Sequence, residues 1–515
     1  GSGIPNYLGV PAISPDGSRA WVPSKQDNVK RGTLRNGFNI NFQNTVRGIS
    51  SKINLVTMAE EFSERVDYDN TGLAGASVYD KSGNYLFVAL EATRQVALVD
   101  AYNGISLGRV NVGRAPDGLA LSADGNKLYV NNFMDRSVSV IDLTDVFTWG
   151  DWTPPVISQL DAVTTENLAA NVLKGKQLFY DAKDTRLARD GYLSCAVCHN
   201  DGSHDGRVWD LTGLGEGLRN TIELRGRGGD AHGLFHWSAN FDEVQDFEGQ
   251  IRSLAEGTGL LTDAQYTATS ESLGTPKAGL NADLDALAAY LGSLNSFEPS
   301  PFRNADGSLT ADAEAGKAIF TNVGCAQCHG GDTFTDSPSG QSHNVGTIKA
   351  SSGKRLNGSL TALDTPTLRD VWKTAPYLHN GSAATVEAAI RAHTSVASIV
   401  DLTAGQISQL AAYVKQIDGD EPPPSNLPPT VAITAPANGA SFLSTAAITL
   451  IANASDADGT ITKVEFYAGA TKLATINSAP PYSYAWLGAE VGTYNITAKA
   501  YDNSGSVTTS TAVSI

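Results

Sequence analysis

The 515-residue sequence predicts a chain of several domains: a β-rich region first, a mainly α-helical region in two similar halves next, and a small β-sandwich last. Three observations predict this order. A β-type unit repeats within residues 1–150, a cysteine motif occurs twice with its flanking segments within residues 151–420, and alternating apolar and polar residues follow a proline-rich segment at residues 421–430. A chain of this length has room for about three hydrophobic cores.

Residues 1–150 contain a repeat that is typical of β-propellers. The segment SGNYLFVALEATRQVALVD is followed by DGNKLYVNNFMDRSVSVID, which places Gly83 and Gly125 at equivalent positions, and likewise Arg94 and Arg136. The offset of 42 residues is the usual length of a propeller blade. These units resemble YVTN-type β-propeller repeats. Because residues 1–150 hold only about three blades of this length, we expect an incomplete propeller.

The motifs CAVCH and CAQCH contain all four cysteines of the chain. In a Cys-x-x-Cys-His motif the two thiols attach a c-type haem and the adjacent imidazole ligates its iron. Four thiolates could instead bind zinc, but both histidines would then have no role. A redox dithiol is expected near a βαβ pattern, which the sequence does not show. The favoured interpretation is two covalent c-type haems, held by Cys195, Cys198 and His199 and by Cys325, Cys328 and His329.

The segments around the two motifs are also duplicated. KGKQLF precedes the first motif and AGKAIF the second, while LDALAAYLGSL closes the first half and ISQLAAYVKQI the second. Both closing segments place apolar residues at helical spacing. We therefore predict two cytochrome c lobes, at residues 151–300 and 301–420, each with an opening helix, a haem loop and a closing helix.

The last part of the chain reads as a separate β domain. EPPPSNLPPT, residues 421–430, predicts a stiff extended linker, because proline fixes φ and removes a backbone donor. Residues 431–515 contain short alternating strands that resemble bacterial Ig-like domains. Asp456 and Asp458 could bind calcium there, although solvated turn residues are the favoured interpretation.

The composition limits the possible partners and the compartment. The formal net charge of −17 and the pI near 4.9 argue against nucleic acid as a partner and favour a basic partner protein. No run of 18 apolar residues occurs, so no transmembrane segment is expected. Covalent haem attachment normally takes place outside the cytoplasm. We therefore expect an exported bacterial protein, periplasmic or extracellular.

The sixth ligand of each haem iron decides between electron transfer and chemistry. Both methionines, Met58 and Met134, lie in the β-rich region, which leaves a histidine, a tyrosine or an open position. His393 is a candidate ligand of the second haem, because TVEAAIRAH predicts a helix that starts at a capping Thr385 and places Val386, Ile390 and His393 on one face. A partly exposed surface histidine is the alternative. The remaining histidines outside the two motifs are His204, His232, His236, His343 and His379.

The segment DTPTLRDVWKTAPYLHNGSAATVEAAI, residues 364–390, resembles the bacterial di-haem cytochrome c peroxidases and their MauG relatives. The similarity covers both helical halves, about half of the chain. In that family the distal ligand of the second haem comes from this part of the lobe, as Met in peroxidases and Tyr in MauG. The resemblance implies that His329 and His393 ligate the second haem, with a lower potential than His/Met ligation gives. It also assigns Arg369 and His379 to the cofactor site, His379 as a neighbour rather than a ligand.

The resemblance implies two further sites between the lobes. One is a calcium ion held by an Asn side chain and by carbonyls of a Thr-x-Pro segment, which match Asn220, Thr374 and Pro376. The alternative for Asn220 is a turn cap. The other is an electron-carrying tryptophan between the haems, for which Trp237 in FHWSANFDEVQDFE is the candidate. The alternative for Trp237 is a packed core aromatic.

The first haem is where peroxide chemistry is expected in this family. Many of its peroxidases carry a mobile distal His shortly before an Arg-Asn pair, but the corresponding stretch here, WDLTGLGEG, has none. The resemblance therefore implies an open first haem, unless His204, His232 or His236 reaches it. A distal acid would then move protons, and Glu248 or Glu243 could serve. Surface carboxylates are the alternative for both.

Two functions follow from these observations. The favoured one is an exported di-haem oxidoreductase that uses hydrogen peroxide and exchanges electrons with a donor or substrate protein. The alternative is a non-catalytic electron-transfer cytochrome in which both haems are six-coordinate. The sixth ligand of the first haem distinguishes them.

Overall fold

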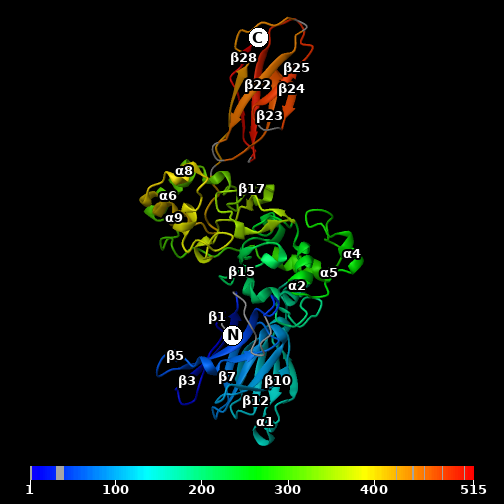
Figure 1. Cartoon of the computed structure of the whole chain (residues 1–515), viewed down its shortest axis with the longest axis vertical. Coiled ribbons are helices and arrows are strands. Elements are labelled where there is room, and N and C mark those ends of the chain that lie inside the picture. The colour runs from blue at the N-terminus through cyan, green and yellow to red at the C-terminus, as the bar shows by residue number, and fades with distance from the viewer. Residues whose placement is uncertain are drawn as a thin grey trace. The chain divides into compact units, whose positions relative to one another are not determined.

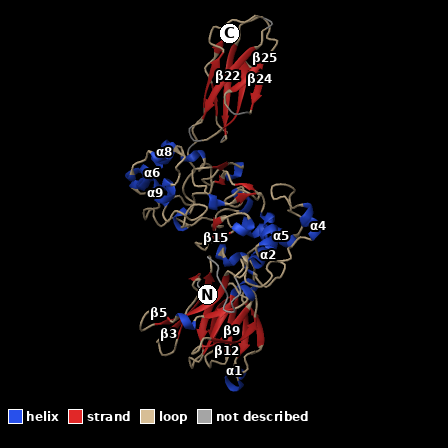
Figure 2. Cartoon of the chain, viewed as in Figure 1, coloured by secondary structure: helices blue, strands red, loops and turns tan. Residues whose placement is uncertain are grey.

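The computed structural model shows strands near both ends of the chain and most helices between them (Figure 1, Figure 2). It describes residues 3–29, 40–424, 426–443, 446–456, 459–477, 480–503 and 505–515. The predicted order of β-rich, mainly helical and β-rich regions is confirmed, whereas the exact domain boundaries stay predictions. Two compact units make up the chain, the first from Gly1–Ser296, Ile348–Ala362 and Thr374–Ala384, the second from Phe297–Thr347, Leu363–Lys373 and Thr385–Ile515.

The first unit begins with three antiparallel sheets. In the first sheet β1 pairs with β3, β3 with β4 and β4 with β5, while β2 pairs with β3 and β6 with β4; the strand orders of the next two are β10-β9-β8-β7 and β11-β12-β13-β14. The strands are β1 (Ile4–Asn6), β2 (Ala12–Ile13), β3 (Arg19–Asp27), β4 (Val46–Asn54), β5 (Ala59–Glu60), β6 (Val66–Tyr68), β7 (Ala74–Tyr79), β8 (Tyr85–Leu90), β9 (Gln95–Asp100), β10 (Ile105–Asn111), β11 (Pro116–Leu121), β12 (Lys127–Asn132), β13 (Ser137–Asp142) and β14 (Val156–Asp161), with helix α1 (Thr144–Trp149) before β14.

The alternating side chains of β8 join the three sheets into one stack. Leu86 and Val88 belong to a core cluster with Trp21 and Tyr68 of the first sheet. Phe87, between them in sequence, belongs to the next cluster, whose other members include residues of the third sheet. Successive side chains of a strand point to opposite faces, so the middle sheet contributes to both cores.

The 42-residue repeat predicted from the sequence is a structural repeat. Gly83 and Gly125 both adopt positive φ, 79° and 85°. Arg94 and Arg136 both follow a 3-10 turn, η2 (Glu91–Thr93) or η3 (Phe133–Asp135), and both lie in the left-handed region. The assignment of these sheets as blades of an incomplete propeller stays a prediction.

The first helical lobe is built on the contact between its opening and closing helices, α2 and α5. Gly175 of α2 makes this close approach possible, because a Cβ atom there would lie 1.8 Å from the Ala286 carbonyl oxygen. Phe179 packs edge-on against Tyr290, with ring centres 5.1 Å apart. The elements of this region are α2 (Ala170–Tyr180), β15 (Val208–Asp210), β16 (Leu218–Asn220), α3 (Glu248–Ser253), α4 (Asp263–Ala268) and α5 (Ala282–Gly292).

The second lobe repeats this arrangement in the second unit. A Cβ atom on Gly316 of its opening helix would lie 2.0 Å from the Gln409 carbonyl oxygen of its closing helix. Phe320 packs edge-on against Tyr413, with ring centres 5.4 Å apart. The duplication read from the sequence is thus a duplicated helix crossing. The elements are α6 (Ala311–Asn322), β17 (Ser342–His343), β18 (Lys354–Arg355), β19 (Gly358–Ser359), β20 (Leu363–Asp364), α7 (Val386–Arg391), α8 (Ala397–Val400) and α9 (Ala404–Val414), of which β18 and β19 belong to the first unit.

The C-terminal region forms two antiparallel sheets around a core that includes Leu450, Phe466 and Ile496. The first has the order β21-β22-β25; the second has the order β24-β23-β26-β27, with β28 beside β26. This is the predicted β-sandwich. Of the possible calcium pair, Asp458 lies outside the described residues. The strands are β21 (Thr430–Ala435), β22 (Ile448–Ser455), β23 (Ile461–Ala468), β24 (Thr471–Ile476), β25 (Tyr482–Trp486), β26 (Asn495–Asp502), β27 (Val507–Thr509) and β28 (Val513–Ser514).

Among the described residues, no helix has the length and apolar character needed to cross a membrane.

Candidate haem-binding and redox site

The first Cys-x-x-Cys-His motif forms a tight turn in the first unit. The 3-10 turn η4 (Cys195–Val197) leads into His199, whose backbone N–H donates to the Cys195 carbonyl at 2.9 Å. The His199 Nδ1 lies 3.1 Å from the Ser203 carbonyl oxygen, which leaves Nε2 as the ligating nitrogen. Burial lowers the pKa of His199. The neutral imidazole is the form that binds a metal.

The second motif has the same local geometry. The turn η9 (Cys325–Gln327) leads into His329, whose N–H donates to the Cys325 carbonyl at 2.9 Å. The His329 Nδ1 lies 3.4 Å from the Phe334 carbonyl oxygen. Burial, and next the proximity of His393, lower the pKa of His329 to about 4. The two imidazoles therefore lie close enough to interact.

His393 lies just beyond α7, the helix predicted from TVEAAIRAH. The Thr385 hydroxyl caps this helix by accepting the Ala388 N–H at 3.1 Å, as predicted. The helix ends at Arg391, two residues before the histidine. The His393 Nδ1 lies 2.9 Å from the Ala389 carbonyl oxygen, and burial lowers the pKa of His393. His393 is thus a neutral imidazole in the second unit, anchored at one nitrogen.

The donor set of both motifs fits a c-type haem. All four thiols are free of disulfides. Cys328, Asp336 and His343 also form the one group of three possible metal ligands among the described residues, with ligand atoms within 4.8 Å of one another. Because the motif predicts that Cys328 attaches the haem, we interpret His343 and Asp336 as an ion pair, 2.6 Å long, rather than as a separate metal site.

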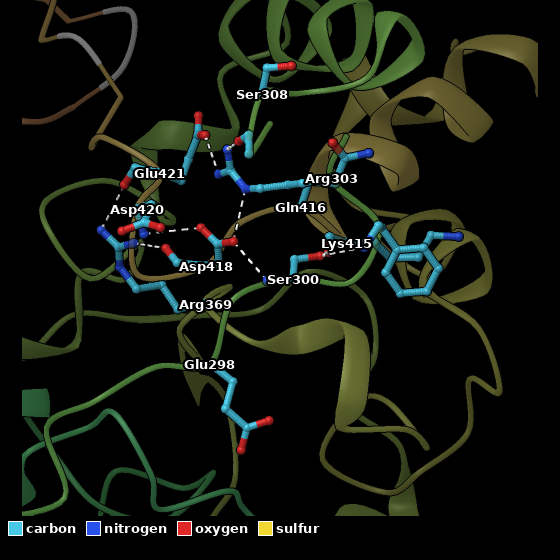
Figure 3. Close-up of polar contacts among 12 residues, drawn as sticks. Glu298, Ser300, Arg303, Ser308, Arg369, Lys415, Gln416, Asp418, Asp420 and Glu421 are labelled. Carbon is cyan, nitrogen blue, oxygen red and sulfur yellow. Dashed lines mark hydrogen bonds and ion pairs between the residues drawn. The ribbon is translucent and has the colours of Figure 1, made fainter. Parts of the chain in front are cut away.

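Arg369 lies in a buried polar network of the second lobe (Figure 3). Its guanidinium donates to the backbone carbonyls of Asp332 at 2.6 Å, Glu421 at 3.0 Å and Asp418. The Asp418 carboxylate in turn pairs with Arg303 at 2.9 Å. The network joins the end of the second lobe to the loop after the second motif.

The guanidinium of Arg369 also lies 5.1 Å from the centre of the Phe334 ring. Because the Phe334 carbonyl is the partner of His329 Nδ1, Arg369 supports the loop that orients this imidazole. The described contacts of Arg369 are those of a positioning residue. Direct contact with the cofactor stays a prediction.

Trp237, His379 and Asn220 lie together in the first unit. The indole Nε1 donates to the Asn220 carbonyl at 2.9 Å. The Trp237 and His379 rings meet edge to face, with centres 6.5 Å apart. His379 is 1% exposed, its Nε2 lies 2.7 Å from the Ser352 hydroxyl, and burial, followed by Arg219, lowers its pKa to about 4. Segments about 140 residues apart in the sequence thus meet around a half-buried indole.

Two of the three predicted calcium ligands, Asn220 and Pro376, lie next to each other. The Asn220 Nδ2 donates to the Pro376 carbonyl, and the Asn220 N–H donates to the His379 carbonyl at 2.7 Å. The buried Oδ1 of Asn220 has no hydrogen bond from the described residues. Thr374 belongs to the same unit. An unpaired side-chain oxygen next to backbone carbonyls is a donor set that suits calcium.

The two predicted acids are engaged by backbone groups. Glu248 is fully buried, and its carboxylate pairs with Arg252 at 2.8 Å and accepts the Leu260 and Leu261 N–H groups at 3.0 and 3.1 Å. The Glu243 carboxylate accepts two backbone N–H groups at residues 277 and 278. Such contacts are typical of residues that hold loops. Their role as acids stays a prediction.

A partly buried Glu–His pair, not predicted from the sequence, lies near Trp237. Glu216 Oε1 is 3.2 Å from His236 Nδ1, and Arg219 pairs with Glu216 at 3.3 Å. Burial raises the pKa of Glu216, but contact with His236 and Arg219 more than offsets this, so its pKa falls to about 2. The sequence signal was weak, because Glu216 lies in a loop 20 residues before its partner.

The three histidines considered for the first haem differ in their contacts. His236 is engaged by Glu216, and His204 Nδ1 accepts the Gly206 N–H at 3.1 Å. His232, at the end of η7 (Gly229–His232), is 9% exposed and makes no hydrogen bond within the described part of the chain. Burial, then Arg227, lower the pKa of His232 to about 3. Of the three, His232 has the imidazole most available as a ligand.

Comparisons with known proteins match the helical and C-terminal regions. The family described as "RoxA-like, cytochrome c-like" matches residues 363–396, and the family described as "Bacterial Ig domain" matches residues 429–509. The chain is 30% identical to the methylamine utilization protein MauG of Methylorubrum extorquens, over 42% of this chain and 67% of that protein. It is 24% identical to a cytochrome c551 peroxidase of Nitrosomonas europaea, over 52% of this chain and 88% of that protein.

A third relative is the hydrazine synthase subunit gamma of Kuenenia stuttgartiensis, 31% identical over 40% of this chain. The match spans 66% of the length of that subunit. The two helix-pair lobes carry Cys-x-x-Cys-His motifs. Together with these relatives, the motifs define the chain as an oxidoreductase with covalently bound c-type haem. It belongs to the family of bacterial cytochrome c peroxidases and MauG proteins.

Proposed function

We propose that this protein is an exported di-haem oxidoreductase, in which peroxide would be reduced at an open first haem. The two oxidising equivalents would pass through Trp237 to a second haem ligated by His329 and His393, so that electrons would flow from the second haem to the first. The haems would supply the one-electron steps and the reduction of peroxide. The chain's own residues would hold the two irons, fix the indole of Trp237 and move protons. The observation that carries the proposal is the packing of Trp237 against His379 and the Asn220 carbonyl.

Ligation of the second haem is supported by the anchoring of both imidazoles. Each has its Nδ1 near a backbone carbonyl, which fixes the ring and leaves Nε2 to ligate. His393 also contributes, after burial, to the lowered pKa of His329. Bis-imidazole ligation should keep the potential of the second haem low.

The role proposed for Trp237 depends on contact and polarity. A large π-system in van der Waals contact with a neighbouring ring shortens the gap that an electron must cross. The hydrogen bond from Nε1 to the Asn220 carbonyl fixes the indole and stabilises positive charge on it.

A distal acid at the first haem would pass a proton between the peroxide oxygens. Glu248 is the stronger candidate, because it is the more deeply buried of the two acids. To act, its carboxylate must exchange the Arg252 or backbone contacts for the substrate. Glu243 is proposed only as a support for its loop.

We also propose that Asn220, Thr374 and Pro376 hold a calcium ion. The unpaired Asn220 Oδ1 supports this assignment, since a buried amide oxygen without a hydrogen bond is unfavourable unless a cation or water binds it. The ion would fix the segment that carries Asn220, and with it the acceptor of the Trp237 N–H.

Export and a protein electron donor or substrate complete the proposal. Covalent haem attachment supports a periplasmic or extracellular location, and the relatives named as cytochrome c peroxidases support peroxide as oxidant. The charge of −17 favours a basic partner protein.

The alternative function is a non-catalytic electron carrier in which both haems are six-coordinate. His232 favours it, because this buried, neutral imidazole has no hydrogen bond from the described residues. If His232 ligates the first iron, no position remains for peroxide.

The deciding measurement is the EPR spectrum of the ferric holoprotein, with and without hydrogen peroxide. One high-spin and one low-spin signal, with the high-spin signal consumed by peroxide, supports the enzyme. Two low-spin signals that peroxide leaves unchanged would overturn it in favour of the carrier. In that case a His232→Ala variant should convert one signal to high spin.

A further inference from the structure

Three buried charged side chains and one partly exposed arginine form a cluster beside the first haem motif. Lys25 of β3 is 0% exposed, and its Nζ lies 3.2 Å from Asp27 Oδ1 and 3.1 Å from Asp205 Oδ2. Arg207 Nε pairs with the other oxygen of Asp27 at 3.0 Å. Two residues of this cluster come from the β-rich region and two from the loop after the motif, all within the first unit.

The β-rich region also holds the backbone of the motif itself. The Lys25 ammonium donates to the Val197 carbonyl, between the two cysteines. The Tyr7 hydroxyl donates to the Cys198 carbonyl at 3.1 Å. Asn6 Nδ2 donates to the Asp205 carbonyl at 2.8 Å. The β-rich region thus contacts two consecutive residues of the motif and the loop that follows it.

Stability alone does not explain this arrangement. Removing a lysine ammonium and two carboxylates from water costs several kcal/mol per ion, and apolar residues of similar volume often stabilise a protein as well. A buried charge next to a redox centre, by contrast, acts on its potential. Reduction adds one negative charge to the haem, so a nearby cation favours the reduced state and a nearby anion opposes it.

We propose that Lys25 and Asp205 are positioning residues through which the β-rich region fixes the first haem loop and sets the potential of the first haem. This inference depends on one part of the proposed function, namely that the protein binds two haems. It makes residues 1–150 part of the redox centre rather than an accessory surface.

The second motif has a different support, which provides an internal reference. Its loop is held by Arg369, through the Asp332 carbonyl at 2.6 Å, inside the second lobe. Substitutions at Lys25 or Asp205 should therefore leave the second haem unchanged. A general disturbance of the fold would affect both.

The test is a spectroelectrochemical titration of the full-length holoprotein, which follows each haem separately. Lys25→Met should lower the potential of the first haem, Asp205→Asn should raise it, and the double variant should return towards the wild-type value. Lys81→Met is the matched control, because Lys81 also donates to a backbone carbonyl, that of Ala123, but at an exposed site. It should change neither haem.

First-haem potentials that stay unchanged in both single variants would overturn the proposal. Shifts of the same sign in both would also overturn it, because they would report a distorted loop rather than charge. If Lys25→Met does not accumulate as holoprotein, Asp205→Asn and the charge-neutral double variant still show in which direction these charges shift the first-haem potential. Peroxide turnover is measured separately. If the two variants shift the first-haem potential in opposite directions but the wild-type protein does not turn over peroxide, this inference stands and the proposed function is refuted.

Discussion

At the scale of single residues, His393 has one imidazole nitrogen committed to the Ala389 carbonyl and the other available to a metal. We predict that His393→Ala converts the second haem from low spin to high spin, because the iron loses its sixth ligand. EPR and the visible spectrum of the ferric protein measure this change. His393→Met should keep the haem low-spin and raise its potential, since thioether ligation favours the reduced iron.

The matched control is His343→Asn. His343 belongs to the same lobe and is bonded to Asp336. This variant should keep the low-spin signal of the second haem. A low-spin signal that survives in His393→Ala would refute the ligation.

Glu91 provides a pH-dependent prediction at the same scale. It is buried in the turn after β8, and burial, followed by Asp117 and Asp201, raises its pKa from the ordinary 4.5 to about 8. Between these values the folded protein retains a proton that the unfolded chain has released. Stability from this group is therefore complete below pH 4.5 and declines as the pH rises to about 8.

The Glu91→Gln variant removes this decline. The melting temperature of the variant minus that of the wild type should rise steadily from pH 5 to pH 8. The rise should be roughly 2–4 °C for each kcal/mol of unfolding free energy that the substitution recovers. Thermal unfolding followed by circular dichroism measures the difference. The exposed Glu271→Gln should show no such trend, and a difference that is independent of pH would contradict the assignment.

Some of these residue-level features could be predicted from the sequence, and others could not. The Thr385 cap depends on neighbours four or fewer positions away, so the local pattern was sufficient to predict it. Lys25 and Asp205 are separated by 180 residues, and no periodicity connects them. The same holds for the Glu216–His236 pair, because only the tertiary fold makes a loop carboxylate a neighbour of that imidazole.

At the scale of elements, the opening and closing helices of each lobe cross at a glycine. The duplicated segments KGKQLF and AGKAIF predicted the helices, and the structure explains the glycine by the carbonyl that a Cβ atom would strike. The strand repeats of residues 1–150 were equally predictable, because alternation and a 42-residue period are local signals. Which sheets contact which lobe was not predictable, since such contacts depend on shape and charge rather than on period.

We predict that Gly316→Ala destabilises the second lobe, although alanine is the better helix former. The added Cβ atom would lie 2.0 Å from the Gln409 carbonyl oxygen, so α6 and α9 must move apart. The expected cost is of the order of 1–3 kcal/mol, as for other overpacked cores. Denaturant unfolding followed at the second haem measures it.

Gly405→Ala is the control for helix propensity. Gly405 lies in α9, and a Cβ atom there would meet nothing within 4 Å. This variant should be neutral or slightly more stable than wild type. Equal stability of the Gly316 and Gly405 variants would show that the close crossing is not required.

At the scale of the whole molecule, the lobes and the β domains contribute differently to function. The cytochrome c-like family matches residues 363–396 of the second lobe, whereas the bacterial Ig domain family matches residues 429–509. The buried contacts of Lys25 and Tyr7 connect the β-rich region to the first motif. We therefore expect the chemistry to take place in the lobes, and the proposed control of the first haem to come from the β-rich region.

The net charge of the whole chain leads to the last prediction. With 54 acidic and 37 basic residues, the protein attracts cationic partners over distances longer than a contact. We predict that it is reduced faster by a basic small cytochrome than by an acidic one of equal potential, as measured by stopped-flow absorbance. Raising the salt concentration should slow the basic donor and speed the acidic one, because the Debye length falls to about 3 Å at 1 M. Rates that are equal and insensitive to salt would mean that the partner recognises a local surface whose charge differs from that of the molecule as a whole.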